Sequence, residues 1–269
     1  MSIITISRGS YSQGKEVAER VAQRLGYECV AREVLLEASE QFNIPEAKLL
    51  MTIKNAPSIL DRFTYGREKY IAYIQAAILK HFQKDNVVYH GMAGHFFVKG
   101  IPHVLKVRII ADMNDRIKVI MERDKVSGKE AMRVIKKLDE ERLKWSRQLY
   151  GIDTGDPSLY DLVLHIQKLS VDDAADIICH TVNLKHFRTT PESQVIMDDL
   201  VLASQVKAIL INLKPDIQVV AKNSVVYLIM EAHTAQDVDL VQEIQQMVGN
   251  LPGLTEVKID VVPSITFSN

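Results

Sequence analysis

Residues 3–15 read IITISRGSYSQGK, and this stretch carries the strongest structural signal in the chain. Residues 3–6 form a short β-branched run, typical of a buried parallel strand, and a polar cluster with Gly9 follows. From Lys15 onward apolar residues recur at fourfold spacing, which predicts a helix that stops at Gly26. A strand, a loop of the form G-x-x-x-x-G-K and a helix, in this order, predict a phosphate-binding loop.

The loop at residues 9–15 has the chemistry that binds phosphate. Gly14 allows close approach to the backbone, successive N–H groups point inward, and the helix N-terminus adds about half a positive charge. Lys15 is expected to reach the β- and γ-phosphates as a mobile point charge. A Ser or Thr that helps to hold Mg²⁺ normally follows this lysine, whereas this chain has Glu16. The alternative is a turn and a helix start that fit the pattern by chance.

Strands and helices alternate along the chain up to residue 183. The predicted strands cover residues 27–30, 87–89, 103–111 and 161–166, and the predicted helices cover residues 32–42, 65–84, 115–123, 128–149 and 171–183. Ser127 and Ser170 each begin a capping-box pattern ahead of a helix. This alternation predicts an α/β fold with a parallel sheet wrapped by helices, and the resemblance described below implies that it is of the P-loop kinase type.

The pattern changes after a polar linker at residues 188–193. The predicted elements that follow are a helix at 196–213, strands at 217–222 and 225–231, a helix at 234–249 and a strand at 256–262. Asn223 and Ser224 form the turn of a predicted hairpin. The sequence therefore predicts one domain at residues 1–187 and a small C-terminal α+β domain, with the order αββαβ, at residues 188–269.

The charge of the chain divides at the same place. The first 188 residues contain 29 basic and 24 acidic side chains, whereas residues 189–269 contain 4 and 10. A basic body favours an anionic ligand, and an acidic C-terminal part disfavours direct adhesion to nucleic acid or anionic lipid. Two modules with different roles are the expected arrangement.

Composition excludes several classes of protein. Of the 269 residues, 47% are hydrophobic and 25% are charged, as in globular proteins. No run of about 18 apolar residues predicts a membrane span, and the N-terminus lacks the basic region of a secretory signal. Cys29 and Cys179 are expected to be free thiols in a reducing cytoplasm. His90, His95 and His103 lack the spacing of a helical metal pair, so they are expected to pack or to form hydrogen bonds.

Short segments spread over residues 2–183 resemble the bacterial cytidylate-kinase-like family of P-loop nucleoside-monophosphate kinases. That family commonly shows the loop S-R-x-x-G-S-G-G-[RK]-E-I-A, followed by L-G-[YF] and D-R-E-[IL]. Glu16 is the residue that this family normally has after the basic residue of the loop. The matching segments are residues 4–8 (ITISR), 14–18 (GKEVA), 25–27 (LGY), 32–35 (REVL), 115–117 (DRI), Arg123, Asp139 and Arg142 in a D-x-x-R pattern, 150–151 (YG) and 160–163 (YDLV).

The resemblance implies a nucleoside-monophosphate kinase that uses ATP and Mg²⁺, with a pyrimidine monophosphate as acceptor and an arginine-rich lid. Phosphoryl transfer depends on positioning and charge neutralisation, which several arginines can supply. The residues assigned to ATP are Gly9, Ser10, Tyr11, Ser12, Gln13, Gly14, Lys15, Glu16, Arg116 and Arg123, and Glu16 is also assigned to the metal. The residues assigned to catalysis are Lys15, Arg142 and Arg147, and those assigned to the substrate are Arg8, Arg32 and Asp161. A solvated helix face is the alternative for the lid arginines, and a structural role at a strand start is the alternative for Asp161.

The sequence departs from the family pattern at four positions. Tyr11 and Gln13 stand where the family has Gly, Ala31 replaces an Asp, and Met92 replaces an Arg. Side chains in the loop can crowd an approaching phosphate, and a thioether cannot neutralise one. Either nearby cations compensate, or the chain is a catalytically degraded nucleotide sensor that signals through its C-terminal domain. The candidates for compensation are Lys99, Arg67 and Arg62.

Residues 204–213, 217–228 and 251–262 resemble a BON domain, a small α/β module that contacts ligands or membranes. Val206 and Leu210 match the V-x-x-x-L pattern of its first helix, and residues 251–257 (LPGLTEV) are similar to its V-x-G-V-x-x-V ending. Ser224 stands where that domain usually has Gly. A dimerisation or regulatory domain is the alternative. The expected partners are therefore a nucleotide substrate and, through this domain, a second copy or a regulator.

Overall fold

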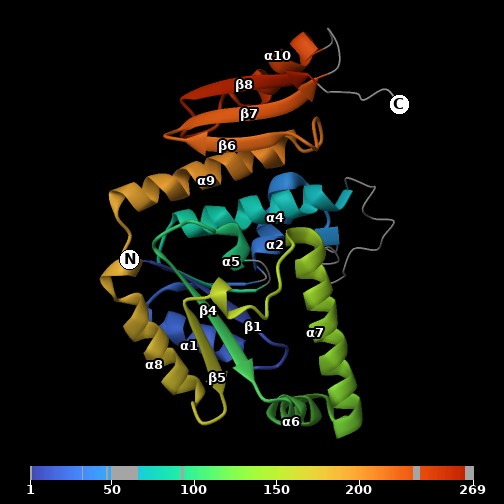
Figure 1. Cartoon of the computed structure of the whole chain (residues 1–269), viewed down its shortest axis with the longest axis vertical. Helices are drawn as coiled ribbons and strands as arrows, with labels where there is room; N and C mark the ends of the chain where they lie inside the picture. Colours follow the sequence, from blue (N-terminus) through green and yellow to red (C-terminus); the bar gives the residue numbers. More distant parts are fainter. Residues whose placement is uncertain are drawn as a thin grey trace.

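A computed structural model describes residues 2–31, 33–46, 48–49, 66–91, 94–232 and 237–263 of the chain. Figure 1 shows a larger sheet surrounded by helices and a smaller sheet stacked beyond helix α9 (Pro191–Leu210). Among the described residues, no helix combines the length and the apolar character needed to cross a membrane.

The larger sheet is parallel throughout its described residues. Its strand order is β2-β3-β1-β4-β5, which places β1 in the middle. Ile3, Ile4 and Ile6 of this central strand are at most 1% exposed. The prediction of a parallel α/β sheet is confirmed. The strands are β1 (Ile3–Arg8), β2 (Glu28–Val30), β3 (Val87–His90), β4 (Val104–Ala111) and β5 (Leu162–Ile166).

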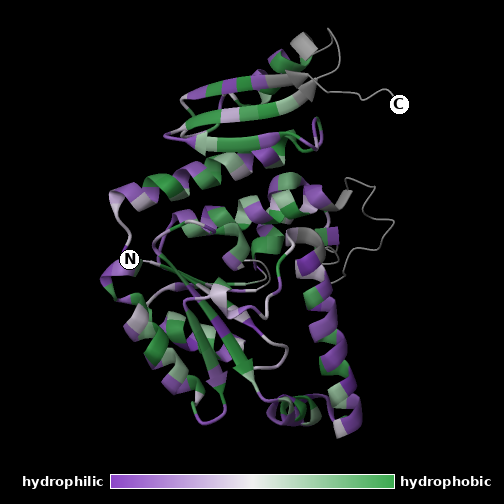
Figure 2. Cartoon of the chain, in the orientation of Figure 1, coloured by the Kyte–Doolittle hydropathy of each residue, from purple (hydrophilic) through white to green (hydrophobic). Residues whose placement is uncertain are grey.

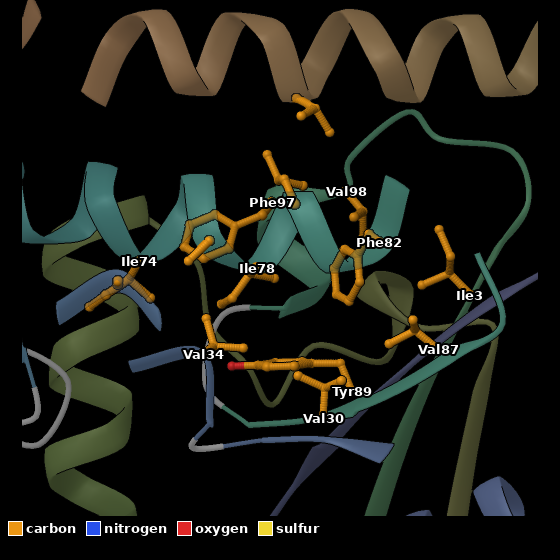
Figure 3. Close-up of a cluster of buried hydrophobic side chains, with 14 of the residues drawn as sticks. Ile3, Val30, Val34, Ile74, Ile78, Phe82, Val87, Tyr89, Phe97 and Val98 are labelled. Atoms are coloured by element: carbon orange, nitrogen blue, oxygen red, sulfur yellow. The ribbon is translucent and has the colours of Figure 1, made fainter. Parts of the chain in front are cut away.

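Helices cover both faces of this sheet. Side chains alternate along β1, so Ile4 and Ile6 pack with α1 and α8, whereas Ile3 packs with the helices of the other face. Figure 3 shows Ile3, Phe82 and Val87 together in that second cluster. Burial on both faces explains why residues 3–6 are almost continuously apolar. The helices are α1 (Gly14–Leu25) and α8 (Val171–Val182) on one face, and α2 (Glu33–Phe42), α4 (Gly66–Gln83) and α5 (Gly94–Phe97) on the other.

Two helices, α6 (Met113–Asp124) and α7 (Gly128–Tyr150), follow β4 and pack against each other through Ile120 and Ile135. The capping signals predicted for α7 and α8 are confirmed. Ser127 Oγ accepts a hydrogen bond from the Glu130 amide at 3.3 Å, and Ser170 forms a complete capping box. Hydrophilic residues cover most of α7, while apolar residues gather on the strands (Figure 2).

The smaller sheet has the strand order β6-β7-β8, from β6 (Gln218–Lys222), β7 (Val225–Ala232) and β8 (Glu256–Pro263). Strands β6 and β7 are antiparallel, and β7 and β8 are parallel, joined through α10 (Asp237–Val248). Asn223 and Ser224 make the predicted hairpin turn, with φ angles of 49° and 65°. Both residues are left-handed, as a type I′ hairpin turn requires. The predicted order αββαβ is confirmed.

Helix α9 packs against both sheets' cores. It begins earlier than predicted because Thr190 and Ser193 form a capping box ahead of the apolar pattern. Met197 and Val201 belong to the hydrophobic cluster that α4 forms with the larger sheet, whereas Val206 belongs to the cluster of the smaller sheet. The division of the chain at residues 187 and 188 stays a prediction, and α9 contributes to both cores.

Replacing Met197 with Ala tests this double role of α9. Met197 is fully buried, so its truncation should lower the free energy of unfolding by about 2–5 kcal/mol. The neighbouring Ile196 is 45% exposed, and Ile196→Ala should change that energy by about 0.5 kcal/mol or less. Urea unfolding of both variants is the measurement. Equal effects would contradict the packing of α9 against α4.

Candidate functional site

The loop between β1 and α1 lies at the carboxyl end of the central strand. Tyr11 and Gln13 have φ angles of 61° and 60°, so both adopt the left-handed conformation. These are the two positions where the family pattern has Gly, and a non-glycine residue there costs about 1–2 kcal/mol. Gln13 precedes the first turn of α1 and makes no side-chain capping bond. The loop therefore has the left-handed backbone that favours glycine at the two positions where the family pattern has glycine.

Contacts from β4 hold this loop in place. The Ser12 hydroxyl lies 3.0 Å from the Gly9 carbonyl and 3.1 Å from the Ile109 carbonyl, and Gly9 N–H donates to the same Ile109 carbonyl. Gly14 meets the Arg8 side chain, because a Cβ at residue 14 would lie 2.7 Å from Arg8 Cβ. Residue 14 must therefore be glycine because the Arg8 side chain occupies the space of a Cβ, whether or not phosphate also contacts it.

Three cavities meet at Arg8. The small cavity, of about 90 Å³, is lined by Ser7 and by residues from the C-terminal half of α7. The large cavity, of about 480 Å³, includes Lys15 and His90. The α7 cavity, of about 230 Å³, is lined by Gly9 and by three residues of α7. Arg8 lines all three, so its side chain stands where ligands bound on either side of it would meet.

The Arg8 guanidinium has no hydrogen bond or ion pair with the described residues. Burial lowers its pKa, and the nearby carboxylates of Glu16 and Glu19 act in the opposite direction. A partly buried cation without a partner is costly unless an anion joins it. Lys15, which lines the large cavity beside Arg8, is half-exposed and lies 3.5 Å from Glu19 Oε1. The arrangement fits an anionic ligand between Arg8 and Lys15.

The wall of the large cavity combines apolar groups with the carboxylates of Glu19 and Glu33 and the imidazole of His90. Val34, Leu35 and Ile74 contribute apolar surface, and Glu33 Oε2 accepts a hydrogen bond from Ala31 N–H at 2.9 Å. Burial, followed by the charge of Arg8, lowers the pKa of His90 to about 4, so its imidazole is neutral near pH 7. Arg32, Met92 and Arg62 lie outside the described residues, as does the side chain of Arg67.

Arginines from α6 and α7 hold the backbone of the loop. Arg116 Nε donates to the Ser10 carbonyl at 2.6 Å, and its Nη2 pairs with Asp139 at 2.5 Å. Asp139 in turn accepts a hydrogen bond from Ser10 N–H at 3.3 Å. Arg142 Nη1 donates to the Arg8 carbonyl at 3.0 Å, and burial lowers its pKa. Of the sequence-predicted residues, Arg116 and Arg142 therefore converge on the loop, and Asp139 joins them.

Tyr11 connects the loop to α6. Arg123 Nη2 donates to the Tyr11 hydroxyl at 3.1 Å, and its guanidinium lies 4.7 Å from the centre of the ring. The hydrogen bond with Asp124, followed by that with Tyr11, raises the pKa of Arg123. The side chain that replaces Gly at residue 11 thus supplies a contact that glycine could not make.

Two other sequence-predicted residues are engaged with the protein. Arg147 Nη2 pairs with Asp153 at 2.6 Å, and Asp153 lines the α7 cavity. Asp161 Oδ2 accepts a hydrogen bond from Lys106 N–H at 2.8 Å at the edge of β4. Lys99, a candidate for compensation, is exposed at the end of the turn after α5. These positions are compatible with both alternatives considered for Arg147 and Asp161.

The structure brings two further groups into the site, Arg108 and Tyr160. Arg108 lies within β4, Tyr160 directly precedes β5, and Arg108 Nη1 donates to the Tyr160 hydroxyl at 3.2 Å. The available sequence signal was a charged residue inside the apolar run at residues 103–111. Neighbouring strands are far apart in sequence, so that signal could not indicate what Arg108 faces.

A divalent cation at a nucleotide site takes most of its ligands from phosphates and water, with one or two protein carboxylates. Glu16 is exposed in the first turn of α1 and can serve as such a carboxylate. The donor set therefore fits a phosphate-bound Mg²⁺. The described residues contain no group of three or more His, Cys, Asp or Glu side chains arranged to hold a metal.

Acidification should destabilise the protein through its buried histidines. The folded-state pKa of His90, about 4, lies below its ordinary value of 6.5, so the unfolded chain binds more protons between these values. This contribution to stability is complete above pH 6.5 and is lost as the pH falls toward 4. Urea unfolding at about pH 7 and about pH 5 should show a smaller loss in His90→Gln than in the wild type. His186→Gln, at an exposed position, controls for the loss of an imidazole, and equal losses in all three proteins would contradict the effect.

Comparison with known proteins agrees with this geometry. The model of the cytidylate kinase-like family matches residues 3–168. A cytidylate kinase from Staphylothermus marinus is 30% identical over 185 residues, covering 66% of this chain and 94% of that protein. A cytidylate kinase from Methanosarcina acetivorans is 35% identical over 100 residues, covering 36% of this chain and 54% of that protein.

A solved structure shares the fold. A crystal structure of an uncharacterized protein from Eubacterium ventriosum matches with a TM-score of 0.54 and 23% identity, covering 69% of this chain and all of that one. The two cytidylate kinases are archaeal, so a bacterial branch stays a prediction, and the family match ends at residue 168, so a BON-like C-terminal part stays one too. The family match spans the loop, Arg8, Arg116 and Arg142. The chain belongs to the cytidylate kinase-like family.

Proposed function

We propose that this protein is a nucleoside-monophosphate kinase that transfers the γ-phosphoryl group of ATP to a pyrimidine monophosphate. The observation that carries the proposal is the Arg8 guanidinium, which lines three cavities and has no partner among the described residues. A cation held without a protein partner beside a phosphate-binding loop fits a reaction in which several phosphates meet.

In the proposed reaction, the loop amides at residues 9–14 and the Lys15 ammonium bind the phosphates of ATP. A phosphate oxygen of the acceptor attacks the γ-phosphorus, the bond to the β–γ bridging oxygen breaks, and ADP and a nucleoside diphosphate are formed. Bound Mg²⁺ supplies charge neutralisation on the phosphates, with Glu16 as a protein ligand. Arg8 and Arg142 contribute positive charge where negative charge moves from donor to acceptor.

The large cavity is the proposed acceptor pocket. It extends from Lys15 and Arg8 to an apolar wall that includes Leu35, Ile74 and Ile78, which suits a ligand with an anionic end and a flat base. Both relatives described above are cytidylate kinases, which supports a pyrimidine base. Arg32 is proposed to bind the acceptor in this pocket. ATP as the phosphoryl donor and a cytoplasmic location are parts of the same proposal.

For the C-terminal part, we propose a regulatory or self-association role. Residues 188–269 form the proposed second domain, of BON-like type, and their charge argues against direct binding to nucleic acid. Because α9 packs on α4, and α4 contributes Ile74 and Ile78 to the large cavity, a ligand or partner on the smaller sheet has a packed connection to the acceptor pocket.

A second candidate function is nucleotide sensing without turnover. The observation that favours it is that two arginines assigned to ATP already have protein partners: Arg116 pairs with Asp139, and Arg123 contacts Asp124 and Tyr11. These pairs must rearrange if both arginines are to contact phosphate. A sensor would bind nucleotide with the loop and leave the acceptor without phosphate.

A coupled assay of ADP formation with CMP, dCMP, UMP and AMP separates these two functions. The kinase proposal expects acceptor-dependent ADP formation that is fastest with a pyrimidine monophosphate. Micromolar ATP binding with no turnover on any acceptor would overturn it in favour of the sensor.

The loop assignment has its own test in Lys15→Ala. Removing the ammonium beside the phosphates should weaken ATP binding by about 100-fold, the effect of losing a charge-assisted contact. Lys168→Ala, at an exposed turn before α8, is the matched control and should bind ATP as the wild type does. Isothermal titration with ATP gives both affinities. If Lys15→Ala keeps the wild-type affinity, the phosphate-binding role of the loop is wrong.

A further inference from the structure

Arg108 lies on β4, opposite Ser7 of the central strand and Val163 of β5. Its side chain lines both the small cavity and the α7 cavity, as do those of Arg8 and Arg142. Three guanidinium groups from two strands and one helix therefore border the same space.

Two part-buried hydrogen bonds, both made by Nη1, orient the Arg108 guanidinium. Its Nη1 donates to Ser7 Oγ at 3.3 Å and to the Tyr160 hydroxyl at 3.2 Å. That hydroxyl also lies 3.0 Å from the Thr154 carbonyl and 3.3 Å from His95 Nε2. Burial, followed by the charge of Arg108, lowers the pKa of His95 to about 3, so a neutral imidazole completes the group. Every partner is neutral, and the hydrogen bonds orient the cation without balancing its charge.

The carboxylates near Arg108 are already paired. Asp139 and Asp153 are the acids among the described residues that line the α7 cavity, and each forms an ion pair with a different arginine. The described lining of the small cavity contains no acid. Arg8, Arg108 and Arg142 thus surround these cavities with no carboxylate ion pair of their own among the described residues. An anion with more than one negative charge is the ligand that balances them.

The size and the neighbours of the small cavity define that anion further. Its volume of about 90 Å³ is too small for a nucleotide, and it shares Arg8 and Gly91 with the large cavity of about 480 Å³. A ligand that fills both needs a compact anionic end and a larger, partly apolar body, which describes a phosphate monoester of a nucleoside. Gly91 directly precedes Met92, the position where the family pattern has an arginine.

We propose that Arg108 binds the phosphate group of the acceptor in the small cavity and supplies the positive charge that Met92 lacks. This inference rests on the proposed kinase function and assigns the compensating cation to β4, instead of to Lys99, Arg67 or Arg62. Tyr160 is a positioning residue, because it orients Arg108 through its hydroxyl and contacts the guanidinium with its ring at 5.5 Å.

Arg108→Met removes the charge and keeps a side chain of similar length. It should raise KM for CMP by about 10- to 100-fold, the loss expected for a charge-assisted contact, while KM for ATP stays within about twofold. Arg108→Lys should fall between the wild type and Arg108→Met. Arg133→Met, at a side chain that is 75% exposed on α7, is the matched control and should leave both constants unchanged. A change in KM for ATP that equals the change for CMP would overturn the assignment.

Titrations with CMP and with cytidine test the same contact without turnover. In the wild type, CMP should bind more tightly than cytidine, and Arg108→Met should reduce this difference by about 10-fold or more. A wild type that binds CMP but forms no ADP overturns the kinase function alone, and the difference between CMP and cytidine then decides the role of Arg108. A difference that survives in Arg108→Met overturns that role.

Thermal unfolding identifies a variant that has lost its fold. If Arg108→Met unfolds, Tyr160→Phe replaces it in both experiments, since it removes only the hydroxyl that orients Arg108. Tyr160→Phe should weaken CMP binding and leave cytidine binding unchanged, whereas an equal loss for both would contradict the positioning role.

Discussion

The burial of β1 on both faces and along both edges is the constraint on which the rest of the molecule depends. Strands β3 and β4 flank it, α1 and α8 cover one face, and α4 covers the other. A strand in this position has no freedom to shift without exposing Ile3, Ile4 or Ile6. Its carboxyl end therefore fixes Arg8 and the start of the phosphate-binding loop in space, and ligands of such sheets bind at that end of the strands.

The same position of β1 gathers positive charge at its carboxyl end. Arg8, Arg108 and Arg142 border shared cavities, and the acids that line the α7 cavity are paired with other arginines. Like charges held together with few partners lower the stability of the free protein. The phosphorylated ligand that we propose would relieve this repulsion, and the same three cations would then supply both binding energy and preorganised positive charge. The left-handed backbone of Tyr11 and Gln13 adds to the cost in the free protein.

Helix α9 links this site to the second sheet. Because its Met197 and Val201 belong to the hydrophobic cluster that includes α4, and its Val206 belongs to the core of the smaller sheet, the two hydrophobic cores share one element. The acidic C-terminal part and the basic body are thus mechanically connected, although their charges and compositions differ. The smaller sheet has the order αββαβ that its sequence pattern predicts, with the left-handed turn at Asn223 and Ser224.

The sequence by itself determined the features that are encoded locally. The β-branched run at residues 3–6, the spacing of Gly9, Gly14 and Lys15, and the capping signals of α7 and α8 predicted a parallel α/β fold with a phosphate-binding loop, because each depends on residues within a few positions of one another. Only the tertiary structure decided which cations share a cavity. Arg8 and Arg108 are a hundred positions apart in the chain, and they meet because β1 and β4 pair in parallel with Ser7 opposite Arg108. Strand pairing of this kind is set by the burial of whole faces, so no local pattern around Arg108 could reveal that its guanidinium would lie beside Arg8 and Arg142 without a carboxylate of its own.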